Sequence, residues 1–484
     1  MHIPLQRTAQ SRRTPAHGAR AVVLGASMSG LLAARVLSEF FDEVTVVERD
    51  HLSGEARPRR GVPQARHTHV LQPRGAKELD GLFPGLLQEF RAAGVPVADA
   101  LDQVHFEVNG HVFLHDPHIV GARRAEGAFY GLSRPFLEAS VLRRVRDLAN
   151  VEILDGYDVE GLTADDGNAR VVGARVSARE VGGPTRELPA DLVVAATGRS
   201  GRAPAWLQEM GYEPPPEERV RVDLMYVSQR VRFAAGSLGR LRALLVGSTP
   251  ERPVAAGGFA QEGGHWIVTL AGYAGHHPPM DREAWLSFGE EILPEHFARA
   301  LRQAEPLEEL QQHRFPANLR RRYDKLRRFP QGFLVTGDAL ASFNPIYGQG
   351  MTVAALEALA LRESLRHGWD ELAPRFFHAA AKPSGEAWRF ALGGDLSLPE
   401  AIVPGARPLP MRAMSAYVDR FQAAAEDDAV MAWRFFDVTG FDQPAAALFS
   451  PDSLRRLAAD RRHRRRAGAL ATAGQVAAVG KGRP

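Results

Sequence analysis

Short apolar runs that alternate with a helical pattern open the chain. Residues 21–24 are aliphatic or small and predict a buried strand, residues 28–40 have the spacing of a packed helix, and residues 44–47 predict a second strand. Strand, helix and strand follow one another within about thirty residues, which is the size of a parallel crossover unit. The pattern therefore indicates an α/β domain.

Further elements follow the same alternation up to about residue 215. They are helices at 76–90 and 136–148, a strand at 151–154, a hairpin of 170–176 with 186–188, and a buried strand at 192–196. A run of three prolines from Pro214 then leads into a region that predicts antiparallel strands at 220–233, 254–261 and 266–273. A strand at 333–336 and a helix at 351–367 return to the first pattern, and the chain beyond about 386 is helical and irregular.

Composition places the chain among ordinary globular proteins. Of its 484 residues 45% are hydrophobic and 24% charged, and 60 basic against 57 acidic residues leave a formal net charge of +3. Because the charge is so balanced we expect no nucleic-acid partner, and the basic run at 461–466 predicts a solvated tail. No segment has the roughly eighteen apolar residues of a membrane-spanning helix and no signal peptide is visible, so we expect a cytoplasmic protein with no transmembrane segment.

The sequence gives little support for a metal site or a catalytic thiol. The chain has no cysteine, which excludes disulfides, cysteine-ligated metals and thiol catalysis. His67 and His69 form an H-x-H pair that could bind a metal, but no third ligand lies near them in sequence, so we favour a loop contact and expect no metal. Phe259, Trp266 and Tyr273 could line an apolar chamber, although their strand spacing favours a place in the core for each.

A glycine-rich turn lies between the first strand and the first helix. Residues 25–30, GASMSG, have the register of G-x-G-x-x-G with Ser27 at the second glycine. Gly25 permits the tight turn, Ser27 is small enough for backbone to approach a pyrophosphate, and Gly30 allows close packing of helix on strand. Glu48 ends the second strand, where a carboxylate can accept hydrogen bonds from ribose hydroxyls. Together these features predict a dinucleotide site.

A second candidate contact follows the predicted strand at 333–336. Gly337 and Asp338 come directly after it, and Asp338 can accept from a ribityl or ribose hydroxyl. The glycine-bearing run at 345–350 then delivers a helix N-terminus where an anion or a polarised carbonyl could rest.

The motifs stand in the order that one family shows. They are residues 25–30 with Glu48 and Arg49, residues 191–199, and Gly337–Asp338 with Pro345, Gly348 and Gly350. This order resembles the single-Rossmann FAD monooxygenases, which include the hydroxylases similar to p-hydroxybenzoate hydroxylase and the squalene-epoxidase-like enzymes. Residues 60–71 and 343–351 look most similar to the actinobacterial polyene epoxidases of polyether antibiotic pathways, and the resemblance spans roughly residues 20–370.

The resemblance implies a role for each motif residue. Gly25, Ser27 and Gly30 would hold the pyrophosphate, and Glu48, followed by Arg49, the ribose. Arg134 would contact the FAD, and Arg60 and Gly61 would lie beside it. Gly337 and Asp338 would hold the ribityl-phosphate side, and the run that contains Pro345, Gly348 and Gly350 would border the isoalloxazine ring.

The implied fold is α/β, with a Rossmann-like FAD-binding domain, a β-sheet substrate domain and a helical C-terminal region. We expect a basic arm at 1–19, a discontinuous FAD-binding domain at 20–215 and 320–385, a substrate-binding sheet domain at 216–319, and a helical region with a basic tail at 386–484.

The implied reaction is oxygen transfer from a flavin C4a-hydroperoxide to a carbon–carbon double bond of an apolar polyketide or terpenoid. FAD and molecular oxygen would carry the chemistry, so no side chain is assigned a catalytic role. Electrons would come from NAD(P)H docked transiently or from a partner reductase, since only one dinucleotide turn is visible. An aromatic or quinone hydroxylase, an FAD-dependent reductase and a non-redox cyclase remain as alternatives.

Overall fold

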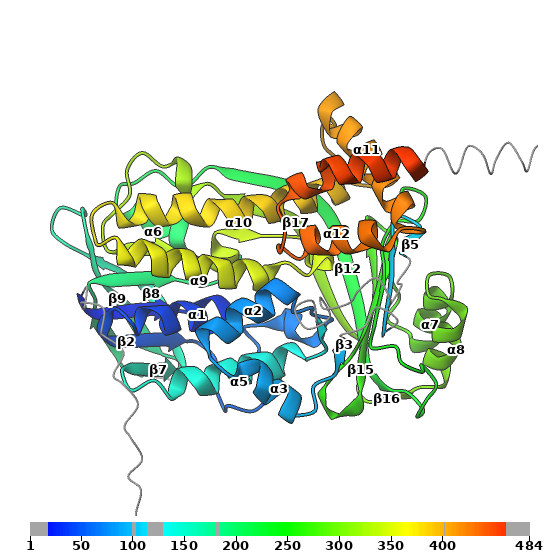
Figure 1. Cartoon of the computed structure of the whole chain (residues 1–484). Coiled ribbons are helices and arrows are strands. Elements are labelled where there is room, and N and C mark those ends of the chain that lie inside the picture. The colour runs from blue at the N-terminus through cyan, green and yellow to red at the C-terminus, as the bar shows by residue number, and fades with distance from the viewer. Residues whose placement is uncertain (1–17, 99–102, 114–128, 181–182, 401, 461–484) are drawn as a thin grey trace, which may run out of the picture.

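The computed structural model describes residues 18–98, 103–113, 129–180, 183–400 and 402–460 (Figure 1). Most of the basic arm expected at 1–19 and the basic run at 461–466 lie outside these residues. Within them, no helix combines the length and apolar content that crossing a bilayer requires.

A parallel sheet forms the first layer, in the order β18-β11-β1-β2-β7. Its strands are β1 (Gly18–Leu24), β2 (Phe41–Glu48), β7 (Val151–Asp155), β11 (Leu192–Ala195) and β18 (Phe333–Val335). The side chains of β11, β18 and the second half of β1 are buried on both faces, which is why these segments read as continuous apolar runs in the sequence. The expected crossover unit of β1, α1 (Met28–Leu37) and β2 is confirmed.

Layers of different kinds cover this sheet. On one side lie α1, α5 (Arg134–Arg146), α9 (Gly350–Arg366) and α10 (Leu372–Asp395), with α2 (Pro73–Leu82) against α9 (Figure 1). On the other, β9 (Val171–Ala178) packs against β11, between its antiparallel neighbours β8 (Tyr157–Ala164) and β10 (Thr185–Pro189). The hairpin expected at 170–188 is therefore confirmed.

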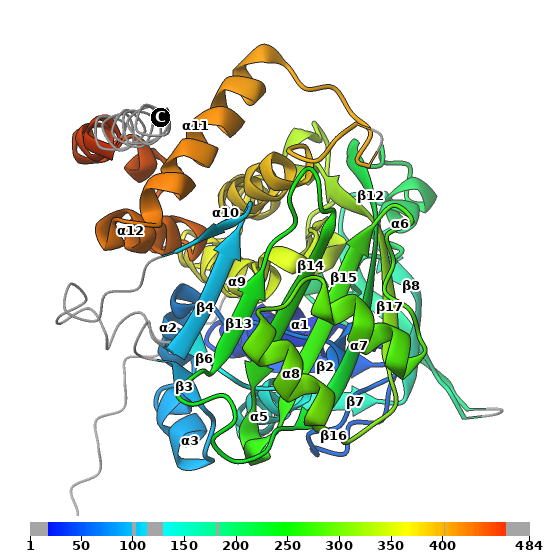
Figure 2. The ribbon, with the colours of Figure 1, turned by 90° about the vertical axis from the view of Figure 1, so that its right-hand side faces the viewer.

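A large second sheet stands beside the first, in the order β19-β17-β12-β15-β14-β13-β4-β5. Its edge strands are β19 (Ala341–Ser342) at one end, and β4 (Val104–Val108) and β5 (His111–Val112) at the other. Its main strands are β12 (Glu217–Arg232), β13 (Ala243–Val246), β14 (Val254–Ala260), β15 (Trp266–Tyr273) and β17 (Gln311–Arg321), and β16 (Glu305–Pro306) pairs with the end of β12. Figure 2 shows α7 (Arg282–Glu290) and α8 (Glu295–Gln303) across its outer face, where they bury an apolar core around Trp285 and Phe297. Residues of its other face line a cavity together with residues that follow the parallel strands.

Three segments depart from the expected boundaries. The helix expected at 76–90 is two helices, α2 and α3 (Leu86–Ala92), because Gly85 takes a left-handed conformation (φ 86°) that ends the helical path. Strands β4 (Val104–Val108) and β5 (His111–Val112), which the sequence placed with the cofactor domain, extend the large sheet by pairing with β13 and with each other. Helix α10 runs through the boundary expected at residue 385.

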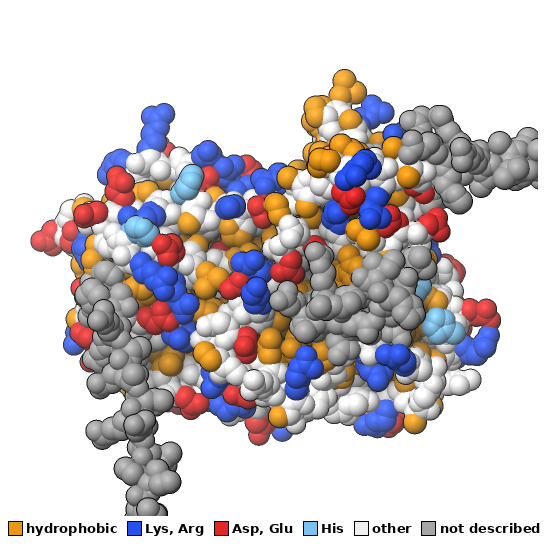
Figure 3. All heavy atoms as spheres, in the orientation of Figure 1, with side chains coloured by type: hydrophobic (Ala, Val, Ile, Leu, Met, Phe, Trp, Pro, Cys, Tyr) orange, Lys and Arg blue, Asp and Glu red, His pale blue; other side chains and the backbone are white. Residues whose placement is uncertain are grey.

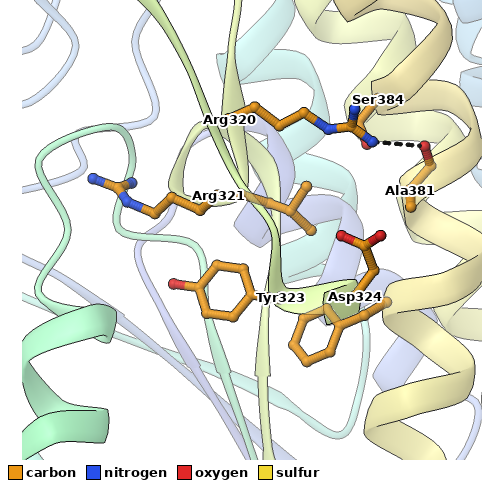
Figure 4. Close-up of a pocket in the computed structure, with 8 residues that line it drawn as sticks. Arg320, Arg321, Tyr323, Asp324, Ala381 and Ser384 are labelled. Atoms are coloured by element: carbon orange, nitrogen blue, oxygen red, sulfur yellow. Dashed lines mark hydrogen bonds between the residues drawn. The ribbon is translucent and has the colours of Figure 1, made fainter. Parts of the chain in front are cut away.

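The two sheets are joined where β17 ends. Arg320 and Arg321 point in opposite directions there (Figure 4), as successive strand residues do. Arg320 donates to the Ala381 carbonyl of α10 at 3.3 Å, whereas Arg321 donates to the carbonyls of Ala339 and Arg199, each at 3.1 Å. These bonds tie the large sheet to α10 and to the loops that follow β11 and β18.

The C-terminal region is helical, as expected. Helices α11 (Leu409–Ala425) and α12 (Ala429–Thr439) pack their aromatic side chains on β4 and β5, through an apolar core that contains Phe106, Phe113 and Phe436. In Figure 3 charges of both signs are interspersed over the face shown, while apolar side chains gather at the protruding start of α11. Leu409 is 77% exposed there.

We predict that Gly30→Ala abolishes folding or FAD retention. A Cβ at Gly30 would overlap the carbonyl oxygen of Gly25, so the turn and α1 would have to separate. The control is Gly81→Ala in α2, where an added Cβ meets no atom within 4 Å. This change should leave stability unchanged or raise it by about 0.5–1 kcal/mol, because alanine favours helix. Melting temperature and flavin content of the two purified variants test the pair, and equal behaviour would contradict the prediction.

Candidate functional site

A cavity of about 640 Å³ lies between the carboxyl ends of the parallel strands and the inner face of the large sheet. Ligands of open α/β sheets bind at this edge. One end is lined by residues that follow β1, β2, β11 and β18, and the other by β12, β14, β15 and β17 together with residues 67–70 and 343–346.

The glycine turn forms one wall of the cavity. Gly25 has φ 106°, and a Cβ there would meet the Ala196 carbonyl oxygen at 2.5 Å, so only glycine fits. Ser27 is the N-cap of α1, but its hydroxyl donates to Glu138 Oε1 at 2.7 Å instead of capping the helix. The first N–H groups of α1 therefore keep no side-chain acceptor, which suits a pyrophosphate.

Glu48 is held against this turn. Its Oε2 accepts from the Ala26 amide at 2.8 Å, and its Oε1 accepts from the Asp50 amide at 3.0 Å. The side chain lines the cavity, and Arg59 approaches Oε2 at 3.3 Å. The carboxylate is thus oriented by backbone before any ligand is bound.

Beneath the turn, Glu138 joins two arginines. Arg134 donates to Glu138 Oε1 at 2.9 Å and to Ser27 Oγ at 3.0 Å, and Arg59 donates to Glu138 Oε2 at 2.9 Å. Burial alone would raise the pKa of Glu138, but Arg134 and Arg59 lower it to about 2. Glu138 therefore stays ionised and fixes Arg134 at the cavity wall.

The sequence analysis did not identify Glu138 or Arg59. Arg134 and Glu138 are four residues apart on α5, a spacing that puts them on one helix face and could have signalled the pair. In the loop after β2, Arg60 is exposed and is not one of the cavity-lining residues, while its neighbour Arg59 points inward. Gly61 does line the cavity, and its amide donates to Asp50 Oδ2 at 2.6 Å.

The second motif meets the first. Gly337 has φ 68°, and a Cβ on it would overlap the Ser29 hydroxyl of α1. Asp338 is exposed to the cavity. The protein that encloses the cavity raises the pKa of Asp338 by desolvation, against the opposing effect of Arg134 and Arg199. Its carboxylate is the acidic group of this motif that a ligand could reach.

A buried glutamate on α9 supports this motif from below. Glu357 Oε2 accepts from the Gly337 amide and the Thr336 hydroxyl, each at 2.7 Å, and Oε1 has no partner among the described residues. Burial raises the pKa of Glu357 to about 7. The site therefore contains a carboxyl group that titrates near neutral pH and was not expected from the sequence.

The run at 345–350 crosses the far side of the cavity. Gly348 is left-handed (φ 64°), and Gly350 begins α9. The N-cap Gln349 turns its side chain away, donating to the Thr439 carbonyl at 3.1 Å, so α9 also starts without a side-chain cap. Two helix N-termini thus end at one cavity.

A buried polar network holds this run in place. Asp395, at the end of α10, accepts from the side-chain amides of Asn318 and Asn344 at 2.6 and 2.7 Å and from the Tyr347 hydroxyl at 3.0 Å. Burial raises the pKa of Asp395 to about 6. The sequence did not indicate this residue, because its partners come from three distant segments.

Most of the predicted cofactor residues therefore meet at one cavity. Ten of them line it, namely Gly25, Ser27, Glu48, Arg49, Gly61, Arg134, Asp338, Pro345, Gly348 and Gly350. Gly30 and Gly337 act through close backbone packing, and only Arg60 lies apart. Arg49 is 58% exposed and lies 3.8 Å from Asp158.

Side chains of the other two candidate sets also have defined places. Among the described residues no group of three or more His, Asp or Glu could hold a metal ion; His67 and His69 line the cavity instead. Trp266 packs with Phe297 under α8, Tyr273 is buried beside Asp395, and Phe259 lies in a small core with Ile267. The expectation that these aromatic residues belong to the core is confirmed.

Two uncapped helix N-termini, a buried arginine and two carboxylates around one cavity make a site that suits a dinucleotide. Residues 19–378 match the model of the FAD binding domain family, and the chain belongs to this family. FAD is accordingly the cofactor of this family.

Two relatives align with most of the chain. The chain is 40% identical over 423 residues to Protein Rv3254 of Mycobacterium tuberculosis, covering 85% of this chain and 87% of that protein. It is 27% identical over 376 residues to kynurenine 3-monooxygenase of Salinispora tropica, covering 75% and 76%.

Solved structures show the same fold at low identity. The p-nitrophenol 4-monooxygenase PnpA of Pseudomonas putida has a TM-score of 0.63 at 19% identity, covering 88% of this chain and 99% of that one. The flavin-dependent brominase Bmp2 has a TM-score of 0.62 at 14% identity, covering 93% and 100%.

We predict that Asp338→Ala weakens FAD binding by at least about tenfold. A charged hydrogen bond of about 1.5–3 kcal/mol would be lost, and 1.4 kcal/mol corresponds to about a factor of ten. Titration of apoprotein with FAD, followed by flavin fluorescence, gives the dissociation constant. Asp42→Ala, an exposed change on β2, is the control. Unchanged FAD binding in Asp338→Ala would remove the assigned role.

We also predict that Glu357 makes stability depend on pH. Its folded-state pKa of about 7 lies above the ordinary value near about 4.3, so its contribution is complete at low pH and is lost as pH rises through 7. Glu357→Gln stays neutral, so its free energy of unfolding, measured by thermal unfolding, should rise relative to that of the wild type between pH 5 and pH 8. One unit of pKa corresponds to about 1.4 kcal/mol, so the gain should exceed about 1 kcal/mol.

The control for this measurement lies on the same helix. Glu363 is exposed at the surface of α9, and Glu363→Gln should run parallel to the wild type across the pH range. A Glu357→Gln curve that is also parallel would show that this carboxyl group does not titrate in the folded protein near neutral pH.

Proposed function

We propose that the protein is an FAD-dependent monooxygenase that acts on a largely apolar small molecule. The observation that carries this proposal is the continuity of the cavity, which runs from the dinucleotide turn to a wall of small side chains on the large sheet. Ala255, Gly257 and Ala271 leave space there for a substrate next to the run at 345–350. Cofactor and substrate would therefore share one space within the protein.

The named relatives support the class of reaction. Kynurenine 3-monooxygenase and p-nitrophenol 4-monooxygenase are both monooxygenases by name, and the chain aligns with most of the length of each. Reduced FAD with molecular oxygen supplies an electrophilic oxygen atom in this kind of chemistry.

Residues of the chain would bind, orient and exclude water. Arg134 and the N-terminus of α1 would hold the pyrophosphate, and Glu48 and Asp338 would accept from cofactor hydroxyls. The run at 345–350, which Asp395 holds through Asn344 and Tyr347, would border the flavin ring. The N-terminus of α9 would stabilise negative charge on that ring.

Within this class we propose epoxidation of a carbon–carbon double bond in a polyketide or terpenoid intermediate of antibiotic biosynthesis. The resemblance of residues 60–71 and 343–351 to polyene epoxidases supports this finer assignment. Hydroxylation of an aromatic or quinone substrate is the alternative on the same scaffold. Electrons would come from NAD(P)H or a partner reductase, in the cytoplasm.

Isotope labelling of the product tests the proposal. Metabolites from producing cells with and without the protein identify the substrate, which is then converted by purified enzyme under ¹⁸O₂ with an electron donor. One labelled oxygen atom should enter the product, as an epoxide for the main proposal or as a ring hydroxyl for the alternative. Equal conversion by photoreduced enzyme without oxygen would exclude a monooxygenase and favour the reductase or cyclase alternatives.

A further inference from the structure

Three histidines face the substrate side of the cavity. His67 and His69 come from the loop before α2, and His313 comes from β17, where it pairs with Tyr226 of β12. The ring centroids of His67 and His313 are 5.6 Å apart. The loop and the sheet thus bring together imidazoles that lie far apart in the sequence.

The hydrogen bond of His69 defines which of its nitrogens is free. Its Nδ1 lies 2.9 Å from the His67 carbonyl oxygen, and a carbonyl only accepts, so Nδ1 carries the hydrogen. Burial, together with Arg134, lowers the pKa of His69 to about 4. At neutral pH the remaining nitrogen, Nε2, is therefore unprotonated and can only accept.

His67 is neutral for a similar reason, and its Nδ1 is also engaged. That atom lies 2.7 Å from Ser228 Oγ, which is 2.6 Å from Thr269 Oγ1, which in turn is 2.6 Å from Thr68 Oγ1. Burial, with a smaller effect of His313, lowers the pKa of His67 to about 3. The hydroxyl groups of this wall bond mainly to one another, so they compete little for a ligand.

Positive charge lies mainly at the opposite end of the cavity. Its described basic lining residues are Arg49, Arg134, Arg199 and Arg202, and all of them follow the strands of the parallel sheet or begin α5. Arg199 lies over the Phe315 ring of the large sheet at 5.0 Å, and the charge of Asp338 acts on it. Arg134 is the cation that acts most on His69, and Glu138 already pairs with it. A carboxylate beside the three imidazoles would therefore compete with Glu138 for this cation.

Resting on the proposed function, we propose that the substrate is a neutral molecule with an apolar body and a hydroxyl group, which donates a hydrogen bond to Nε2 of His69. The apolar body lies against Ala255, Gly257 and Ala271. The hydroxyl group gives the otherwise apolar chamber a directional contact. A substrate without this hydroxyl group would leave Nε2 of His69 as a buried acceptor without a partner.

Binding of three matched probes to the FAD-loaded protein tests this inference. They are 2-naphthol, 2-methoxynaphthalene and 2-naphthoate, which share one apolar body and differ in the polar group. Changes in the spectrum of oxidised flavin at pH 7.5 report binding without any turnover. 2-Naphthol should bind at least about tenfold more tightly than either of the others, the factor expected for one buried hydrogen bond.

Variants assign the preference to one residue. His69→Phe should weaken 2-naphthol by about tenfold and leave 2-methoxynaphthalene unchanged, whereas His69→Gln, which keeps an acceptor, should preserve the preference. His276→Phe, an exposed histidine, is the control. FAD content and melting temperature establish that each variant is folded.

Several outcomes would overturn the inference. Tightest binding of 2-naphthoate would point to Arg199 as the recognition group, and equal binding of naphthol and ether, or no binding of any probe, would show that no hydroxyl contact exists. A His69→Phe variant that loses FAD but keeps the naphthol preference would assign His69 to the cofactor. These binding results are independent of the ¹⁸O₂ experiment, so either proposal can fail alone.

Discussion

The ion network around Glu138 is the interaction on which the site depends. Its carboxylate bonds to Arg134, Arg59 and Ser27, and these residues belong to α5, the loop after β2 and the glycine turn. Removing one partner from such a buried pair costs about 3–5 kcal/mol, because the other charge is left uncompensated. The network therefore fixes three segments relative to one another and keeps the N-terminus of α1 open towards the cavity.

Two further carboxyl groups, deeper in the protein, support the remaining walls. Glu357 holds the backbone of Gly337, and Asp395 holds the run at 345–350 through Asn344 and Tyr347. In the part of the chain that the structure describes, no cation bonds to either carboxyl group, so burial raises the pKa of both, whereas the two arginines lower the pKa of Glu138. A carboxyl group thus lies beneath each of these segments. The pKa of this group is lowered where arginines bond to it and raised where burial acts without a bonded cation.

The cavity itself divides into two chemical environments. Charged groups and the N-terminus of α1 surround the end near the parallel sheet, which suits the pyrophosphate and sugars of a dinucleotide. The end near the large sheet presents small apolar side chains, neutral imidazoles and hydroxyl groups that bond to one another. This division would allow one cavity to hold a charged cofactor together with the apolar substrate proposed above.

The sequence by itself determined the local parts of this protein: the strands, the glycine turn, Glu48 at a strand end and Asp338 after a buried strand. Each depends on neighbouring residues, so periodicity and spacing reveal it. Only the tertiary structure placed Glu138, Asp395 and His313, whose partners Arg59, Asn318 and His67 lie 79, 77 and 246 residues away along the chain. Only it showed that Arg59 rather than Arg60 points inward in an irregular loop. The pairing of β4 with β13 was likewise decided by long-range contacts, which leave no periodic trace in the chain.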